Sequence, residues 1–414
     1  MFMKIKKYNI EICILLSVIS LLLYSSDPVI YSDSNRYLNA SLKDPPLYSS
    51  IIILMKIIFR SLESVIVIQT LLIALGIIHL LKTFTLYLSI DFITRVITST
   101  FLLLPTIIFY NHLLTEPFGY AFSLFFVSYV IRSIHNFNNQ NLIWTTIFVI
   151  LLLLLRNQFI FLYLVILIIY IGVYILYNSK KVNISLIISF ISILLIHNST
   201  ITINKYIKKI NQKNSSLNML NEYRGAFRMA SNDAIYISTI KNIELFKDPN
   251  LQETLRKIYK KMNNQKLLLR YNDNRGHFSI SYPKIDDYTE TLLKDLAIRK
   301  NTTVKKFRKE IFYTLVKENY YEYVVLLFKK FYDSTWLFII LPIIVFTSSL
   351  VNFLKYKSHF SLVAIFISTF ALGNHSIVYL FGRVQPRYFI YTDFILLIFI
   401  FITFTIFYQK IRLK

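Results

Sequence analysis

Long apolar runs without charged residues constrain this chain more than any other feature. Segments 143–155 and 159–177 contain no Asp, Glu, Lys or Arg. In lipid, every backbone N–H and C=O group must be hydrogen-bonded within the spanning structure, which favours helices of about 20 residues. Because 55% of the 414 residues are hydrophobic, a soluble protein could not bury this surface. The sequence therefore predicts an all-α, polytopic membrane protein.

Ten apolar segments are predicted to span the membrane. Lys4, Lys6 and Lys7 precede the first of them, so the positive-inside rule places the N-terminus on the cytoplasmic side of a cell (inner or plasma) membrane. Every inside loop then carries at least one Lys or Arg, and the C-terminus is cytoplasmic as well. The predicted spans cover residues 8–25, 62–81, 92–110, 117–133, 142–155, 158–177, 183–203, 334–354, 359–380 and 388–409.

The chain is expected to have three parts. Residues 1–203 form an N-terminal membrane domain that includes the first outer loop, and 334–414 form the C-terminal transmembrane helices. Between them, 204–333 is a hydrophilic insertion that we expect to be an extracytoplasmic, mainly helical domain. A loop of this length escapes the positive-inside rule, so its many cations do not draw it to the cytoplasm.

Other segments have weaker patterns. Residues 47–60 are apolar but short and are interrupted by Lys56, so an interfacial or re-entrant helix on the outer surface is expected. Amphipathic spacing predicts helices at 251–262 and 304–331. Residues 268–282 are expected to be loop with short extended pieces.

Charge and composition narrow the partners. The formal net charge of +24 is spread over loops between apolar segments, which favours anionic lipid headgroups and phosphate-bearing substrates over nucleic acid. The chain has seven glycines and contains neither a Walker loop nor a dinucleotide-binding pattern, which argues against an ATPase or a nucleotide cofactor. The single cysteine, Cys13, excludes an intrachain disulfide.

The predicted topology brings two acids to the outer face. Asp33 follows the first apolar segment, and Glu116 precedes Pro117. A carboxylate beside a low-dielectric region can act as a general base if its protonation state is tuned. The alternatives are a solvated loop residue or a helix N-cap for Asp33, with Asp27 and Asp44 competing for the same role, and helix-start capping for Glu116.

Three arginines are predicted at the same face. Arg156 stands between two long apolar segments with almost no loop, where a cation is costly unless it has a partner. Arg383 and Arg387 precede the last span, and guanidinium groups can bind phosphate oxygens in a fork. The alternatives are snorkelling of Arg156 to lipid headgroups and a short outer loop that happens to be basic.

Several short motifs follow one another along the membrane part. The first outer loop contains Asp33-Ser-Asn-Arg-Tyr37 with Ala40 and then Pro45-Pro-Leu-Tyr48, and the second contains Leu114-Thr-Glu-Pro117. Together with Arg156 and Arg387-Tyr388, this order resembles the GT-C class of integral membrane glycosyltransferases, which includes protein mannosyltransferases and lipid A aminoarabinose transferases. A second acid beside Glu116, common in some members, is missing here. The resemblance barely covers residues 204–300.

The resemblance implies transfer of a hexose or pentose, with inversion, from a polyprenyl-phosphate donor to a hydroxyl of a glycan, lipid or protein acceptor. It implies no certain cofactor, although a divalent cation near Glu116 would fit. The rival functions are a transporter or flippase and a polymerase of lipid-linked saccharides. The implied catalytic residues are Asp33 and Glu116, and the implied substrate-binding residues are Arg36, Tyr37, Arg156, Arg383, Arg387 and Tyr388.

Overall fold

In the computed structural model, the regular secondary structure of the described residues is helical, apart from one isolated parallel β-bridge between Val29 and His112. Chain contacts divide it into two compact units. The membrane unit comprises Met1–Lys205, Ile340–His375 and Pro386–Lys414, and the second unit comprises Tyr206–Ile339 and Ser376–Gln385. The described residues are 2–24, 27–31, 34–38, 45–213, 227–268, 277–381 and 388–412.

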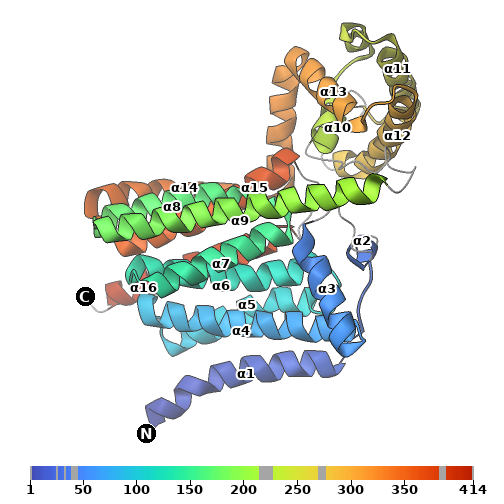
Figure 1. Ribbon diagram of the computed structural model, residues 1–414. Coiled ribbons are helices and arrows are strands. Elements are labelled where there is room, and N and C mark those ends of the chain that lie inside the picture. Colours follow the sequence, from blue (N-terminus) through green and yellow to red (C-terminus); the bar gives the residue numbers. More distant parts are fainter. Residues whose placement is uncertain are drawn as a thin grey trace. The chain divides into compact units, whose positions relative to one another are not determined.

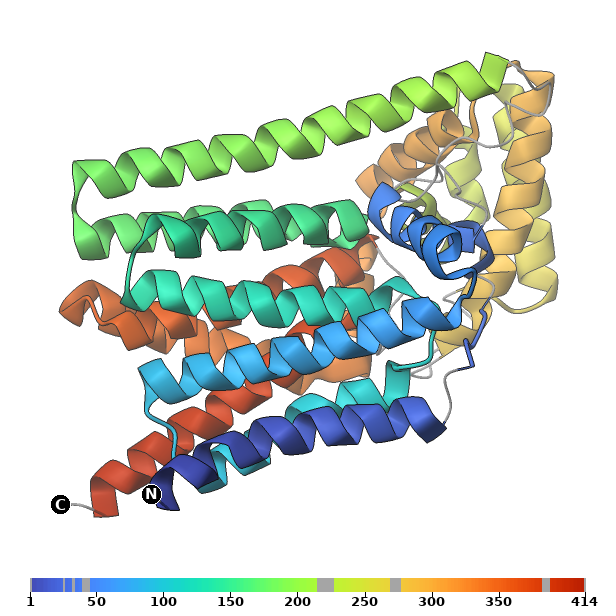
Figure 2. The same ribbon diagram turned by 60° about the horizontal axis from the view of Figure 1, so that its bottom comes forward.

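Most helices of the membrane unit run alongside one another (Figures 1 and 2). All helices of this unit are α1 (Phe2–Tyr24), α2 (Ser34–Leu38), α3 (Pro46–Phe59), α4 (Glu63–Leu88), α5 (Phe92–Phe109), α6 (Thr115–His135), α7 (Asn139–Leu155), the 3-10 helix η1 (Asn157–Phe161), α8 (Leu162–Tyr177), most of α9 (Lys180–Lys213), the end of α14 (Tyr320–Tyr356), α15 (His359–Phe381) and α16 (Ile390–Arg412), counted over the described residues.

Among the described residues, eight helical segments are long and apolar enough to cross a membrane, which confirms an all-α, polytopic membrane protein. They are Glu63–Leu88, Phe92–Phe109, Thr115–His135, Asn157–Tyr177, Lys180–Asn204, Ile339–Tyr356, His359–Val378 and Ile390–Gln409. Two further predicted spans correspond to shorter apolar helices, Ile10–Tyr24 and Asn139–Leu155. The count of ten spans, the orientation and the three-part division stay predictions.

Helix α6 lies at the centre of the membrane unit, packed against α4 and α7. Gly76 on α4 permits a close approach, since a Cβ there would lie 3.1 Å from Leu124 Cβ and 3.2 Å from the Ala121 carbonyl oxygen. The hydroxyls of Thr83 and Ser128 are hydrogen-bonded across the same contact. Small and hydroxylated residues thus join the two helices.

Helix α3 has 14 residues, about 21 Å of length, which is shorter than a bilayer core of about 30 Å. It buries Tyr48, Ile52 and Met55, packs on α4 and α7, and runs at a steep angle to α4 in Figure 1. The helix ends at its C-cap residue, Arg60, whose backbone has a left-handed conformation with φ 54°. A location at the membrane interface stays a prediction.

The second unit has its own apolar core. On α11, Leu251, Leu255, Ile258 and Met262 share one buried face, as the predicted amphipathic helix requires. The regular elements of this unit are α10 (Phe227–Ile237), the 3-10 helix η3 (Ile240–Leu245), α11 (Pro249–Asn264), α12 (His277–Arg299), α13 (Val304–Glu318) and the beginning of α14.

Two predictions for this part were wrong in detail. The helix expected at 304–331 is interrupted at Asn319, which caps α13 in a non-helical conformation before α14 starts. Residues 277–282 belong to α12 instead of a loop, whereas residues 269–276 of that expected loop lie outside the described residues. Helix α9 ends at Lys213 and helix α14 begins at Tyr320, so residues 204 and 333, the predicted limits of the insertion, lie within helices.

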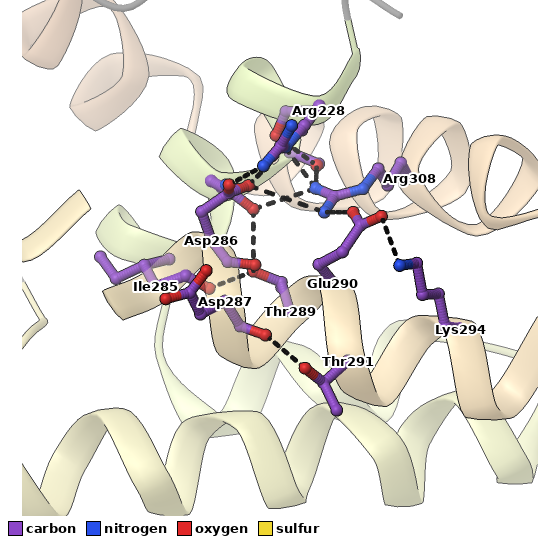
Figure 3. Close-up of polar contacts among 11 residues, drawn as sticks. Arg228, Ile285, Asp286, Asp287, Thr289, Glu290, Thr291, Lys294 and Arg308 are labelled. Atoms are coloured by element: carbon purple, nitrogen blue, oxygen red, sulfur yellow. Dashed lines mark hydrogen bonds and ion pairs between the residues drawn. The ribbon is translucent and has the colours of Figure 1, made fainter. Parts of the chain in front are cut away.

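A buried ionic network ties α10, α12 and α13 together (Figure 3). Arg308, 2% exposed, donates to Glu290 Oε2 at 2.9 Å and also to backbone and side-chain oxygens of α10. Asp286 accepts hydrogen bonds from Arg228 and Asn232. These charges are therefore paired inside the unit, as buried charges must be.

Candidate functional site

The site is centred on an ion pair between Glu116 and Arg156. Arg156 Nη1 lies 3.0 Å from Glu116 Oε1. Glu116 stands in the first turn of α6, where the helix dipole favours an acid, and Thr115 Oγ1 donates to its Oε2 at 3.2 Å. Only 4% of the Glu116 side chain is exposed. The acid therefore lies where the helix dipole favours its charge and binds a cation at the same time.

Arg156 owes its position to the break between α7 and α8. Its backbone is extended, with φ −159° and ψ 135°, and η1 begins at the next residue. A single non-helical residue thus ends one helix and turns its side chain toward α6. The guanidinium also meets two tyrosines: Nη1 donates to Tyr391 Oη at 3.2 Å, and Cζ lies 4.3 Å from the centre of the Tyr388 ring.

One edge of the Arg156 guanidinium makes no hydrogen bond to any residue that the structure describes. Every hydrogen bond that the Arg156 guanidinium makes within the described residues comes from Nη1, and the Arg156 side chain is 21% exposed. Burial opposes its charge, but the Glu116 carboxylate and the neighbouring tyrosine hydroxyls outweigh burial and raise the pKa of Arg156. The cation is permanent, and its Nε and Nη2 donors have no partner in the part of the chain that the structure describes.

The segment between α1 and α3 is attached to the loop that leads into Glu116. Val29 exchanges backbone hydrogen bonds with the chain on either side of His112, and Tyr31 Oη is hydrogen-bonded to His112 Nε2 at 3.1 Å. Ser34 Oγ donates to the Leu113 carbonyl oxygen at 2.8 Å. The described residues that flank position 33 are thereby fixed beside the entry to α6.

Four predicted site residues are not placed by the structure. Asp33, Arg383 and Arg387 lie outside the described residues, and so does the side chain of Arg36. Glu116, Arg156 and Tyr388 come together as described above. Of the competing acids, Asp27 is exposed and Asp44 lies outside the described residues.

The rings of Tyr37 and Tyr48 pack together next to α6. Tyr37 is buried and meets Tyr48 edge-on at 5.0 Å between ring centres, and Tyr48 packs on Phe118 at 5.7 Å. Burial, followed by the charges of Tyr37 and Glu116, raises the pKa of Tyr48 well above its ordinary value. The Tyr48 hydroxyl is fully buried, yet it has no hydrogen-bond partner among the described residues. Such a group is costly unless something else satisfies it.

No protein-family model, curated protein or solved structure matches the chain. The GT-C resemblance therefore rests on the sequence motifs alone. The predicted divalent cation near Glu116 also stays a prediction, since the described residues contain no group of three His, Cys, Asp or Glu side chains suited to a metal ion.

Sequence reasoning missed a polar network on α15 and α16. His375 Nε2 lies 2.8 Å from Asp393 Oδ1, both side chains are nearly buried, and the His375 ring stacks on Phe389. Asn374 and Gln158 are hydrogen-bonded to each other and to the Tyr388 carbonyl oxygen. The available signal was the presence of polar and ionisable side chains inside apolar segments, which is unusual in membrane helices.

Proposed function

We propose that this protein is a membrane glycosyltransferase that moves a sugar from a polyprenyl-phosphate donor to an acceptor hydroxyl, in the biosynthesis of a cell-envelope glycan. The observation that carries the proposal is the half-satisfied guanidinium of Arg156. Its Nη1 is held by Glu116 and Tyr391, while the remaining donors have no partner among the described residues. A planar fork of this kind suits the oxygens of a phosphate.

The proposed reaction is a direct displacement. Asp33 accepts the proton of the acceptor hydroxyl, whose oxygen forms a bond to the anomeric carbon. The bond between that carbon and the phosphate oxygen breaks, and its electron pair leaves with the polyprenyl phosphate. Arg156, assisted by Arg383 or Arg387, stabilises the charge that develops on the leaving group. Glu116 orients the acceptor and keeps Arg156 in place.

Other residues of the site fit this chemistry. The Tyr48 hydroxyl, which has no hydrogen-bond partner among the described residues, can donate or accept a hydrogen bond once a sugar hydroxyl reaches it. The attachment of the chain on both sides of position 33 to the loop before Glu116 favours a common site for both acids. Membrane lipids would surround the polyprenyl tail, which is apolar.

One observation favours a second candidate, a transporter of lipid-linked or acidic cargo. His375 and Asp393 form a buried hydrogen-bonded pair between two predicted spans, and ionisable pairs within membrane helices often mark ion or proton pathways. In that case the arginines would bind cargo instead of a leaving group.

The two functions differ in whether the donor is cleaved. Purified full-length protein in lipid nanodiscs is given a polyprenyl-phosphate sugar and a mixture of acceptor glycans, and release of polyprenyl phosphate is measured by mass spectrometry. We expect acceptor-dependent release that falls by about 10²–10⁴-fold in Asp33→Asn and is retained in Asp27→Asn. In proteoliposomes, intact donor that reaches the opposite leaflet without cleavage would instead establish the transporter.

A further inference from the structure

Tyr388 is held at its backbone from two directions. Its carbonyl oxygen accepts a hydrogen bond from Gln158 Nε2 at 3.0 Å and another from Asn374 Nδ2 at 2.9 Å. Gln158 follows Arg156 by two residues in η1, whereas Asn374 lies on α15. The two amides are also bonded to each other, and Asn374 Nδ2 lies 3.1 Å from Thr392 Oγ1. Two separate parts of the membrane unit, η1 and α15, therefore hold this single carbonyl group.

The next residue is held as well. The Phe389 ring stacks on His375 with 4.3 Å between ring centres and an angle of 10°. His375 is fixed in turn by Asp393, which also accepts from Thr392 Oγ1 at 3.2 Å. The backbone that carries the Tyr388 side chain thus has little freedom to shift or rotate.

The position of the Tyr388 ring decides how Arg156 presents its donors. A guanidinium whose face lies on an aromatic ring keeps its N–H groups pointing outward in its own plane. Here the ring centre is 4.3 Å from Arg156 Cζ, and Nη1 points to Glu116 and Tyr391. The ring and these acceptors together restrict the position of the guanidinium and the direction of its remaining edge.

We propose that Gln158 and Asn374 are positioning residues of an anion site: by holding the Tyr388 carbonyl, they set the ring that orients Arg156 toward the phosphate of a prenyl phosphate. The proposal rests on the proposed function for the identity of the anion. Under this proposal, two neutral amide side chains that are far apart in the sequence help to set the affinity for phosphate. Neither amide need touch the ligand.

The test compares farnesyl phosphate with farnesol, which has the same prenyl chain without the phosphate. Binding to full-length protein in nanodiscs is measured for wild type, Gln158→Met and Asn374→Leu. We expect each variant to bind farnesyl phosphate about tenfold more weakly, as loss of one buried hydrogen bond would imply, and to bind farnesol unchanged. Inorganic phosphate is added as a competitor, and competition at micromolar concentrations would identify free phosphate as the ligand of the same oriented arginine.

Asn141→Leu is the matched control. Asn141 is also buried in the membrane unit and donates to a backbone carbonyl, that of Asn136 at 3.2 Å. Its loss should lower the thermal stability in a similar way without changing the preference for farnesyl phosphate. An equal loss of preference in Asn141→Leu and Asn374→Leu would overturn the proposal.

A double-mutant cycle tests whether the amide acts through the ring. In a Tyr388→Leu background, Asn374→Leu should have little further effect on farnesyl phosphate affinity, because the ring that it positions is gone. A full additional tenfold loss would contradict the proposal, and so would a wild type that shows no preference for the phosphate. If the preference and the cycle behave as expected but no sugar is transferred, the positioning role stands and the proposed transferase fails.

Discussion

Arg156 lies 3.0 Å from Glu116 although 40 residues separate them in the chain. Helices α6 and α7 form a hairpin between the two, so the acid that begins the hairpin and the base that ends it meet at the same end. The pair is close to neutral as it stands. An anionic ligand at Arg156 must therefore share the guanidinium with the Glu116 carboxylate or take its place.

This competition gives a prediction for Glu116→Gln. Removal of the carboxylate charge should strengthen the binding of farnesyl phosphate, because Arg156 then has no anionic partner among the described residues. Arg156→Lys should weaken binding moderately through loss of the planar fork, and Arg156→Ala should weaken it most. Arg60→Ala, at the exposed end of α3, serves as control. Weaker binding in Glu116→Gln would show that the carboxylate supports the ligand, either by holding Arg156 in place or through a cation.

Tyr48→Phe should separate stability from activity. Removal of a fully buried hydroxyl without a partner among the described residues should leave stability unchanged or raise it by about 1–3 kcal/mol. If the hydroxyl binds the sugar, the same variant should lose transfer while its melting temperature rises. Thermal unfolding and product release are measured on one preparation. A lower melting temperature would mean that the hydroxyl is satisfied within the protein.

Gly119→Ala should disturb the site through packing alone. A Cβ at this position would lie 2.8 Å from Cε1 of Tyr391, whose ring is fully buried and cannot easily yield. We expect the Tyr391 hydroxyl to move away from Arg156 and the affinity for farnesyl phosphate to fall several-fold. Gly76→Ala, which introduces a tight contact at Leu124 instead, controls for general destabilisation. Equal affinity losses in the two variants would remove the link to Arg156.

The buried network of the second unit should be essential for its stability. Arg308→Met would leave the Glu290 carboxylate buried without its main partner, at a cost of about 3–5 kcal/mol. Lys305→Met, an exposed position on the same helix, should change little. Adding Glu290→Gln to Arg308→Met should restore part of the loss. Both effects are measured on the full chain, by its thermal unfolding and by the rate at which trypsin cleaves within the second unit.

Asp248 should make the second unit sensitive to acid. Its burial opposes ionisation, but hydrogen bonds from Lys300 Nζ at 3.1 Å and from the Asn250 amide at 3.0 Å outweigh burial and lower the pKa of Asp248 from 3.8. A group with a lowered folded pKa contributes stability above its unfolded pKa and loses it as the pH falls through the folded value. The difference in melting temperature between wild type and Asp248→Asn should therefore be largest near neutral pH and disappear at strongly acidic pH. Lys300→Met should reduce that difference, and a difference independent of pH would contradict the assignment.

The helical membrane architecture could be read from the sequence because uncharged apolar runs have few structural solutions. The positions of Glu116 and Arg156 could be predicted too, since each stands alone at the end of an apolar segment. Asn374 and Asp393 could not be placed, because a single polar residue in an apolar run does not indicate which helix it faces. The break at Asn319 was missed for a related reason: the amphipathic pattern continues across it.

A single residue, Arg156, separates α7 from η1, and the same residue forms the ion pair with Glu116. One inserted residue before position 156 would turn every following side chain by about 100° around the helix axis. Arg156 and Gln158 would then both face away from α6 and α15. We therefore expect length changes in this turn to abolish function even where they preserve folding. Its length, more than its composition, is the constraint that engineering of this chain has to respect.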